Sequence, residues 1–157
     1  MIWKTYAGKI IEEPIELAVE QVIEHFKGEN QRIKICIGTD SSVKSGHIDM
    51  VTVILFYVIG NGGFMYVKKQ KLQTKMSMRE RMMAEVTASI ETAYLIHPVI
   101  EKNGVDMEIH ADINKDSRFQ SNQALSDAMG YTKGMGYVFV SKPDAFASSV
   151  CADRLCQ

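Results

Sequence analysis

The chain has few of the residues that cross-link or stiffen a protein. Its 157 residues include 3 Pro and 3 Cys. Cys36, Cys151 and Cys156 are an odd number without the spacing of a disulfide framework, which indicates a reducing compartment and hence the cytoplasm. A zinc site formed by these three cysteines is disfavoured because the sequence contains no CxxC pair.

Long apolar runs are absent as well. No stretch approaches the length that crosses a membrane, and residues 1–4 do not begin the apolar stretch of a signal peptide. The formal net charge of −1 provides no overall attraction to nucleic acid or to membranes, so any basic surface that binds them must be local. Because repeats and linkers are also absent, we expect one domain over residues 1–157, in which residues 1–30 form an N-terminal extension with a helix.

Hydrophobic periodicity predicts helices that alternate with strands. The expected helices cover about residues 14–27, 77–97 and 122–129, with a last one from Pro143-Asp144 to the end, and the expected strands cover about residues 33–40, 50–59, 64–69, 105–111 and 137–140. The Gly60-Asn61-Gly62-Gly63 cluster indicates a hairpin, Gly130 would stop the third helix, and Ser77-Met78-Arg79-Glu80 matches a capping box. A hairpin attached to strands joined by crossovers predicts an α/β fold with a mixed sheet and helices packed on it.

Four acidic residues stand where this pattern would bring them together. They are Asp40 and Asp112, each at the end of a strand, Glu85 inside the long helix, and Asp144 at the start of the last helix. A carboxylate at the tip of a parallel strand faces the crevice where open α/β sheets bind ligands. Four such groups would repel one another unless a divalent cation were bound, so the set predicts a hard-metal site that acts on phosphates.

Helical geometry selects Glu85 among the acids of the long helix. Around an apolar stripe centred on Met82, Glu85 falls about 60° from the centre, whereas Glu80 and Glu91 fall on the solvent side at about 160° and 180°. A carboxylate that half-faces the sheet needs a partner, and a metal would supply one. The alternative for Glu85 is a rim position paired with Lys or Arg.

The fourth acid is less well defined. Asp144 could be a plain helix N-cap, and Asp153, nine residues further on and about 13 Å along a helix, is the weaker alternative as a ligand. His110 lies on the polar face of its strand, where a structural role is more common than a proton shuttle.

Several short motifs resemble those of the ribonuclease H-like superfamily and, within it, the bacterial YkuK-type family. The residues that carry the closer resemblance are Ile37-Gly38-Thr39-Asp40-Ser41, Arg81-Met82-Met83-Ala84-Glu85-Val86 with Ser89-Ile90-Glu91, His110-Ala111-Asp112-Ile113-Asn114, Ser121-Asn122, Gly130-Tyr131, Lys142-Pro143-Asp144-Ala145-Phe146-Ala147 and Ala152-Asp153-Arg154. Together they span nearly the whole chain after the first helix. Asp144-Ala145-Phe146-Ala147 is similar to a motif of Holliday-junction resolvases, but Ala152-Asp153-Arg154-Leu155 resembles the pattern near the fourth acid of ribonucleases H, so the two aspartates compete.

The resemblance implies a fold, a cofactor and an activity. The fold would be a five-stranded mixed sheet in the order 3-2-1-4-5, and the cofactor two Mg²⁺ or Mn²⁺ ions held by Asp40, Glu85, Asp112 and Asp144, with Asp153 as the alternative fourth ligand. Two such ions would activate a water and stabilise the leaving oxygen of a phosphodiester. The implied activity is that of a nuclease on RNA or DNA.

Basic residues near these acids are candidates for contact with phosphates. Lys68, Lys69, Lys71, Lys75, Arg79 and Arg81 lie between the third strand and the long helix, and Lys142 lies beside Asp144. Of these, Lys75, Arg79, Arg81 and Lys142 are the predicted substrate contacts, and lysines that protect a solvated edge strand are the equal alternative. Two other functions stay open: hydrolysis of a small phosphate ester, and non-catalytic binding of nucleic acid. The pattern predicts no membrane partner and leaves the oligomeric state undefined.

Overall fold

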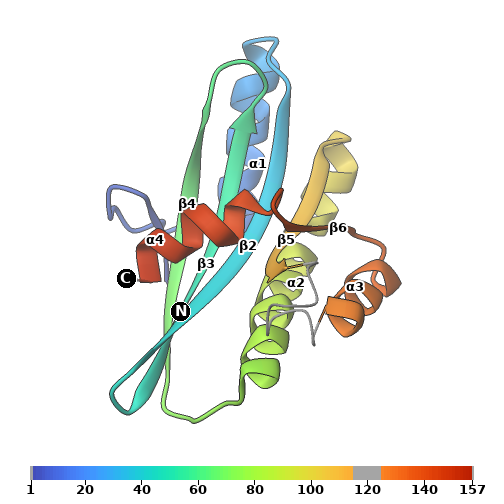
Figure 1. Ribbon diagram of the computed structural model, residues 1–157. Helices are drawn as coiled ribbons and strands as arrows, with labels where there is room; N and C mark the ends of the chain where they lie inside the picture. The colour runs from blue at the N-terminus through green and yellow to red at the C-terminus, as the bar shows by residue number, and fades with distance from the viewer. Residues whose placement is uncertain (1, 115–124, 157) are drawn as a thin grey trace.

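The computed structural model describes residues 2–114 and 125–156, in which one sheet carries helices on both faces (Figure 1). The strands are β1 (Trp3–Thr5), β2 (Ile33–Lys44), β3 (His47–Val58), β4 (Gly63–Leu72), β5 (Asp106–Asn114) and β6 (Val138–Lys142). The helices are α1 (Ile15–Gly28), α2 (Met78–Asn103), α3 (Leu125–Gly134), the π-helical η2 (Ala147–Ala152) and α4 (Asp153–Cys156). Among the described residues, no helix is both long and apolar enough to span a membrane.

The sheet is mixed and has the order β1-β4-β3-β2-β5-β6. The pairs β1/β4, β4/β3 and β3/β2 are antiparallel, whereas β2/β5 and β5/β6 are parallel. The expected order of the five longer strands is therefore correct, but the expected number of strands is wrong. β1 adds a sixth strand at the edge beside β4, and three residues are too few to produce a readable period.

The strand that carries Asp40 is longer than expected. Its parallel pairing with β5 ends at Thr39 opposite Ala111, but its antiparallel pairing with β3 continues to Lys44 opposite His47. The prediction that this strand ends at Asp40 is thus wrong, because the β2–β3 hairpin carries the ladder beyond that point. Asp40 and Asp112 nevertheless lie on adjacent parallel strands, each one residue beyond the last parallel pair.

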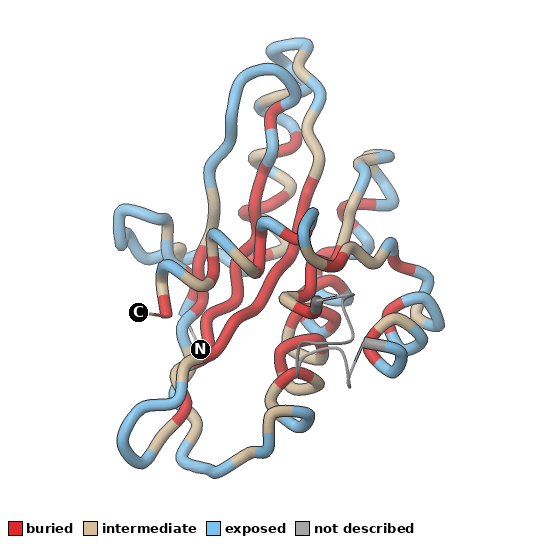
Figure 2. The backbone as a smooth tube through the Cα atoms, viewed as in Figure 1, coloured by how far each residue is buried: buried red, intermediate tan, exposed pale blue. Residues whose placement is uncertain are grey.

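Two apolar clusters lie on opposite faces of the sheet. The first joins α1 and α2 to side chains such as Ile35 and Ile37 of β2, and the second joins η2 and α4 to Cys36 and to Val51 and Val53 of β3. Adjacent residues of β2 face opposite sides because side chains alternate along a strand. In Figure 2 the buried backbone follows the centre of the sheet and the helix faces turned toward it.

The long helix begins as the sequence predicts and ends later. The Ser77 side chain accepts from the backbone of Glu80 and the Glu80 side chain accepts from the backbone of Ser77, which completes the capping box. The helix passes Pro98 and ends at Asn103, where Gly104 adopts a left-handed conformation with φ of 62°.

The C-terminal helices depart from the expected bounds. Gly130 does not stop α3, which continues to Gly134, and the expected start of this helix at residue 122 lies outside the described residues. Asp144 does not open the last helix. Its backbone N–H donates to the Ser141 carbonyl at 3.0 Å in a turn after β6, and the N-cap of η2 is Phe146.

Candidate metal centre

The site is built on polar residues of β2 where its parallel pairing with β5 ends, and their side chains alternate between the two faces of the sheet. Thr39 and Ser41 face α2, where Thr39 Oγ1 lies 2.7 Å from Ser89 Oγ. Asp40 faces the last helix and is 9% exposed. Burial raises the pKa of the Asp40 carboxyl to about 6, and the charge of Asp153 and a hydrogen bond with it act in the same direction.

Glu85 approaches this position from α2. It is 4% exposed and accepts a hydrogen bond of 2.5 Å from Ser41 Oγ. Burial raises the pKa of Glu85 to about 8, and the nearby charge of Asp40 also raises it. Glu80 and Glu91 are exposed, so α2 has the orientation that its apolar stripe predicts.

Arg81 lies one turn before Glu85 and belongs to the same cluster. Its positive charge lowers the pKa of both Asp40 and Glu85, although burial outweighs it at each carboxyl. Its Nε atom is buried and has no hydrogen-bond partner within the described part of the chain. A buried donor without a partner is rare and has unused hydrogen-bonding capacity.

The remaining predicted acids occupy two different places. Asp112 is paired with Lys142, with 2.5 Å between Oδ1 and Nζ. Asp144 is exposed in the turn after β6, where its charge acts on His110. The structure therefore brings Asp153 to Asp40 and leaves Asp144 at the surface. The roles of all these residues as ligands stay predictions.

The last helix reaches Asp40 because it lies directly on the backbone of β2. A Cβ atom added to Gly38 would lie 2.4 Å from Ser148 N and 2.5 Å from Ala147 C, so only glycine permits this approach. At the far end, Cys156 Sγ donates to the Asp40 carbonyl at 3.2 Å, and Ser42 Oγ donates to the Cys156 carbonyl at 3.0 Å. These contacts hold the helical turn that carries Asp153 against the strand that carries Asp40.

The other predicted phosphate contacts are dispersed. Arg79 forms an ion pair with Asp127 of α3, and Lys75 is exposed before α2. Lys68 is buried with its Nζ 5.1 Å from the centre of the Trp3 ring. Only Arg81 and Lys142 of the predicted set stand next to predicted acidic residues.

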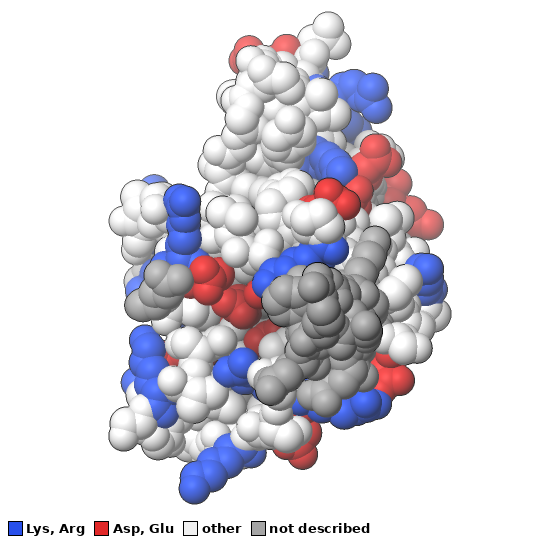
Figure 3. Space-filling view, viewed as in Figure 1, with Lys and Arg blue, Asp and Glu red and all other residues white. Residues whose placement is uncertain are grey.

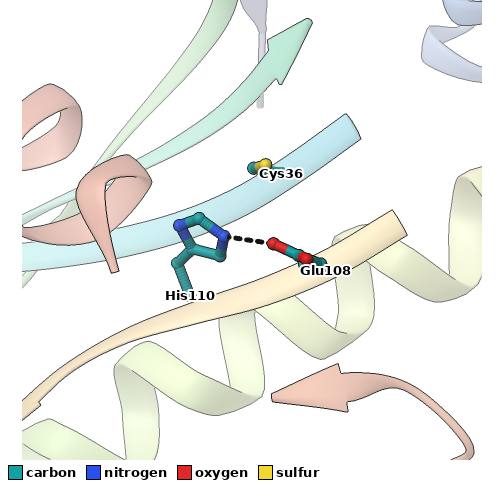
Figure 4. Close-up of side chains that lie close together, drawn as sticks. All are labelled: Cys36, Glu108 and His110. Carbon is teal, nitrogen blue, oxygen red and sulfur yellow. Dashed lines mark hydrogen bonds and ion pairs between the residues drawn. The ribbon is translucent and has the colours of Figure 1, made fainter. Parts of the chain in front are cut away.

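A second polar cluster, Cys36, Glu108 and His110, was not predicted as a unit. In the described residues it is the only group of three potential ligand atoms within 4.8 Å of one another (Figure 4). The polar atoms of Glu108 and His110 already have partners: Lys34 Nζ lies 2.7 Å from Glu108 Oε1, His110 Nε2 lies 2.9 Å from Glu108 Oε2, and the Ala147 N–H donates to His110 Nδ1 at 3.2 Å.

This arrangement defines the protonation of the cluster. Because Nδ1 of His110 accepts a hydrogen bond, Nε2 carries the proton and donates it to Glu108, which leaves His110 no lone pair for a cation. Burial lowers the pKa of His110 and raises that of the Cys36 thiol to about 12, so both stay neutral. The cluster is a hydrogen-bonded link between β2, β5 and η2. The sequence signal for this cluster was the spacing of Glu108 and His110, which are two residues apart in one strand and therefore lie on the same face of it.

The acidic cluster, by contrast, suits a hard cation. Asp40, Glu85 and Asp153 offer only oxygen atoms, the ligands that Mg²⁺ and Mn²⁺ prefer. Burial and Asp153 raise the pKa of Asp40, and burial and Asp40 raise the pKa of Glu85. A bound cation would lower both pKa values.

A mixed sheet of this order, with buried acids on its central strand and on the helix that follows the antiparallel strands, defines the ribonuclease H class of α/β folds. A family model described as Ribonuclease H-like matches residues 18–157, and the chain belongs to this family. Searches of curated proteins and of solved structures found no significant match.

Proposed function

We propose that the protein is a divalent-metal-dependent nuclease that hydrolyses phosphodiester bonds of RNA or DNA. The observation that carries this proposal is that Asp40 lies between two other acids: Asp153 raises the pKa of its carboxyl, and Asp40 in turn raises the pKa of the buried Glu85. Negative charge gathered in this way gives a pure binding module no advantage, because it repels phosphates in the absence of a metal.

Asp40, Glu85 and Asp153 would hold Mg²⁺ or Mn²⁺, two ions in the proposed two-metal form, with Asp112 as a further ligand and Asp144 as the alternative to Asp153. The cations supply stabilisation of phosphate charge and a lowered pKa of bound water. Ser41 orients the Glu85 carboxylate through its hydrogen bond of 2.5 Å. Arg81, with its buried orphaned Nε, is the proposed contact for a phosphate oxygen.

A non-catalytic nucleic-acid-binding module is the second candidate. The ion pair between Asp112 and Lys142 favours it, because a lysine in place of a cation already neutralises one predicted ligand. The two candidates differ in a measurable way: the module predicts binding of nucleic acid without metal-dependent cleavage.

The test compares the wild type with Asp40→Asn in Mn²⁺, on RNA, DNA and RNA–DNA hybrid substrates. We expect the wild type to cleave at least one substrate and to gain melting temperature with metal, and Asp40→Asn to lose both effects. Asp106→Asn is the matched control. It removes the same charge from an exposed residue at the start of β5, away from Asp112, and should behave as the wild type. Equal metal stabilisation of the wild type and Asp40→Asn, with no cleavage by either, would refute the proposal.

A further inference from the structure

A row of lysines lies on the face of the sheet that carries α4. Lys69 and Lys71 of β4 share the parity of Val67, which packs in the η2–α4 cluster, and Lys4 of β1 is paired with Val67. Side-chain alternation therefore directs all three lysines to this face. All three are exposed, and Lys69 Nζ also donates to the carbonyl of Leu155 at 3.0 Å. We call this row the lysine groove.

The groove contains a cavity at its outer end. This cavity has a volume of about 590 Å³, and its lining includes Lys4, Tyr6, Lys69 and Leu155. Tyr6 is 69% exposed, so its ring is accessible for stacking. The volume is within the range of pockets that accept a small organic group such as a nucleobase.

A second cavity extends the groove toward the neighbours of Asp40. It measures about 310 Å³, shares Lys69 and Leu155 with the first, and reaches Val51 and Cys156. Val51 is the pairing partner of Asp40, and Cys156 Sγ donates to the Asp40 carbonyl. The two cavities are thus adjacent and extend from Val51 and Cys156, the neighbours of Asp40, to β1.

The charges along this path favour a polyanion. The residues that line the two cavities include Lys4, Lys44, Lys69 and Lys71 against a single acid, Asp49, whose Oδ2 lies 2.9 Å from Lys44 Nζ. In Figure 3, acidic side chains gather in the middle of this face of the molecule and basic side chains lie around them.

We propose that the lysine groove binds the segment of a single-stranded nucleic acid that flanks the bond to be cleaved. This inference rests on the proposed function and adds to it the form of the substrate. The path crosses from β2 to β1 over three strand spacings, about 14 Å. Lys4, Lys69 and Lys71 contact consecutive phosphates, and a base enters the outer cavity and stacks on Tyr6.

A single strand fits this groove better than a duplex. Stacking on Tyr6 inside a cavity requires a base whose face is free, and in a duplex both faces of each base are covered by its neighbours. Lysines without an accessible ring would have suited either form, so Tyr6 is the residue that discriminates.

The experiment measures binding of fluorescent oligo-U and oligo-dT of about 16 nucleotides by anisotropy, with Ca²⁺ in place of Mg²⁺ to limit cleavage. We expect the triple variant Lys4→Gln, Lys69→Gln, Lys71→Gln to bind about 10-fold more weakly and its log–log salt slope to fall by about 2, since three phosphate contacts are removed. The triple variant Lys27→Gln, Lys102→Gln, Lys133→Gln changes the charge equally on α1, α2 and α3 and should bind as the wild type.

A second pair of variants tests the stacking. Tyr6→Ala should weaken single-strand binding about 10-fold and leave duplex binding unchanged, whereas Tyr6→Phe should retain the wild-type affinity because it retains the ring. Equal losses for duplex and single strand would overturn the single-strand assignment. Unchanged affinity and salt slope in the lysine variant would overturn the groove.

Cleavage assays separate this inference from the proposed function. A wild type that cleaves nucleic acid while the groove variants bind normally would refute the groove alone. A wild type that binds through the groove but never cleaves would refute the nuclease and leave the groove intact. A wild type that neither binds nor cleaves would refute both.

Discussion

Asp40 illustrates how one residue can belong to two environments. Its backbone carbonyl accepts from Cys156, and its side chain meets Asp153 from the last helix while Glu85 approaches from the opposite face of the sheet. Asp40 can be approached in this way because it lies just beyond the parallel pairing: β5 no longer pairs with β2 after Thr39.

The first prediction at this scale concerns the fourth ligand. We expect Asp153→Asn to reduce the Mn²⁺-induced gain in melting temperature nearly as much as Asp40→Asn, because Asp153 is the carboxylate that lies against Asp40. Asp144→Asn should be nearly silent, since Asp144 is exposed in the turn after β6. Thermal denaturation of the three variants with and without Mn²⁺ measures this, and the reverse ranking would assign the role to Asp144.

The sequence identified some residues of the candidate site better than others. Asp40 and Glu85 could be selected because strand position and helix phase are local properties. The proximity of Asp153, rather than Asp144, to Asp40 could not be predicted, because it depends on a π-helical turn and on where that turn rests on β2. The partnership of Asp112 with Lys142 is likewise a contact between strands that spacing along the chain does not encode.

At the scale of elements, the contact between η2 and β2 determines the geometry of the site. The two backbones meet at Gly38 without an intervening side chain, and the Ala147 N–H reaches across to His110 of β5. The last helix is therefore positioned by two strands at once.

We predict that Gly38→Ala weakens metal binding more than its distance from the acids suggests. The new Cβ would force Ala147 and Ser148 away from β2, which should cost about 1–3 kcal/mol of stability and withdraw Asp153 from Asp40. Urea denaturation and Mn²⁺ titration measure the two effects. Gly28→Ala is the control, because a Cβ there meets nothing within 4 Å. Normal metal affinity in Gly38→Ala would show that η2 does not position the site.

Long periodic elements were predictable and short ones were not. The stripe of α2 and its capping box gave both the start of the helix and its buried face. β1, with three residues, and the turn before η2 are defined by pairing and packing rather than by their own pattern.

At the scale of the whole molecule, the buried carboxyls couple stability to pH. The folded pKa values of Asp40 and Glu85, about 6 and about 8, lie above those of an unfolded chain, so the folded state holds more protons between about pH 4 and pH 8. Stability from these groups is complete below their unfolded pKa values and is lost as the pH rises through the folded ones.

We therefore predict that in EDTA the free energy of unfolding decreases from pH 5 to pH 8 by about 2–4 kcal/mol. Mg²⁺ should restore most of this loss at pH 8, where the carboxylates are ionised, and little at pH 5. Urea denaturation at both pH values measures the effect, and Asp40→Asn should show a smaller decrease. Stability that is constant or rises over this range would contradict the coupling.

Because Asp153 lies at the junction of η2 and α4, the proposed nuclease would become active only late in its own synthesis. Translation places β2, α2 and β5 before this residue, so Asp40, Glu85 and Asp112 exist in the growing chain while the face of β2 and β3 under η2 and α4 is still bare. A chain that breaks off before Asp153 would lack a proposed metal ligand and the part of the cover that α4 provides. Incomplete copies of a potentially destructive enzyme would thus be inactive and poorly folded, and activity would begin only when the last helix closes on the sheet.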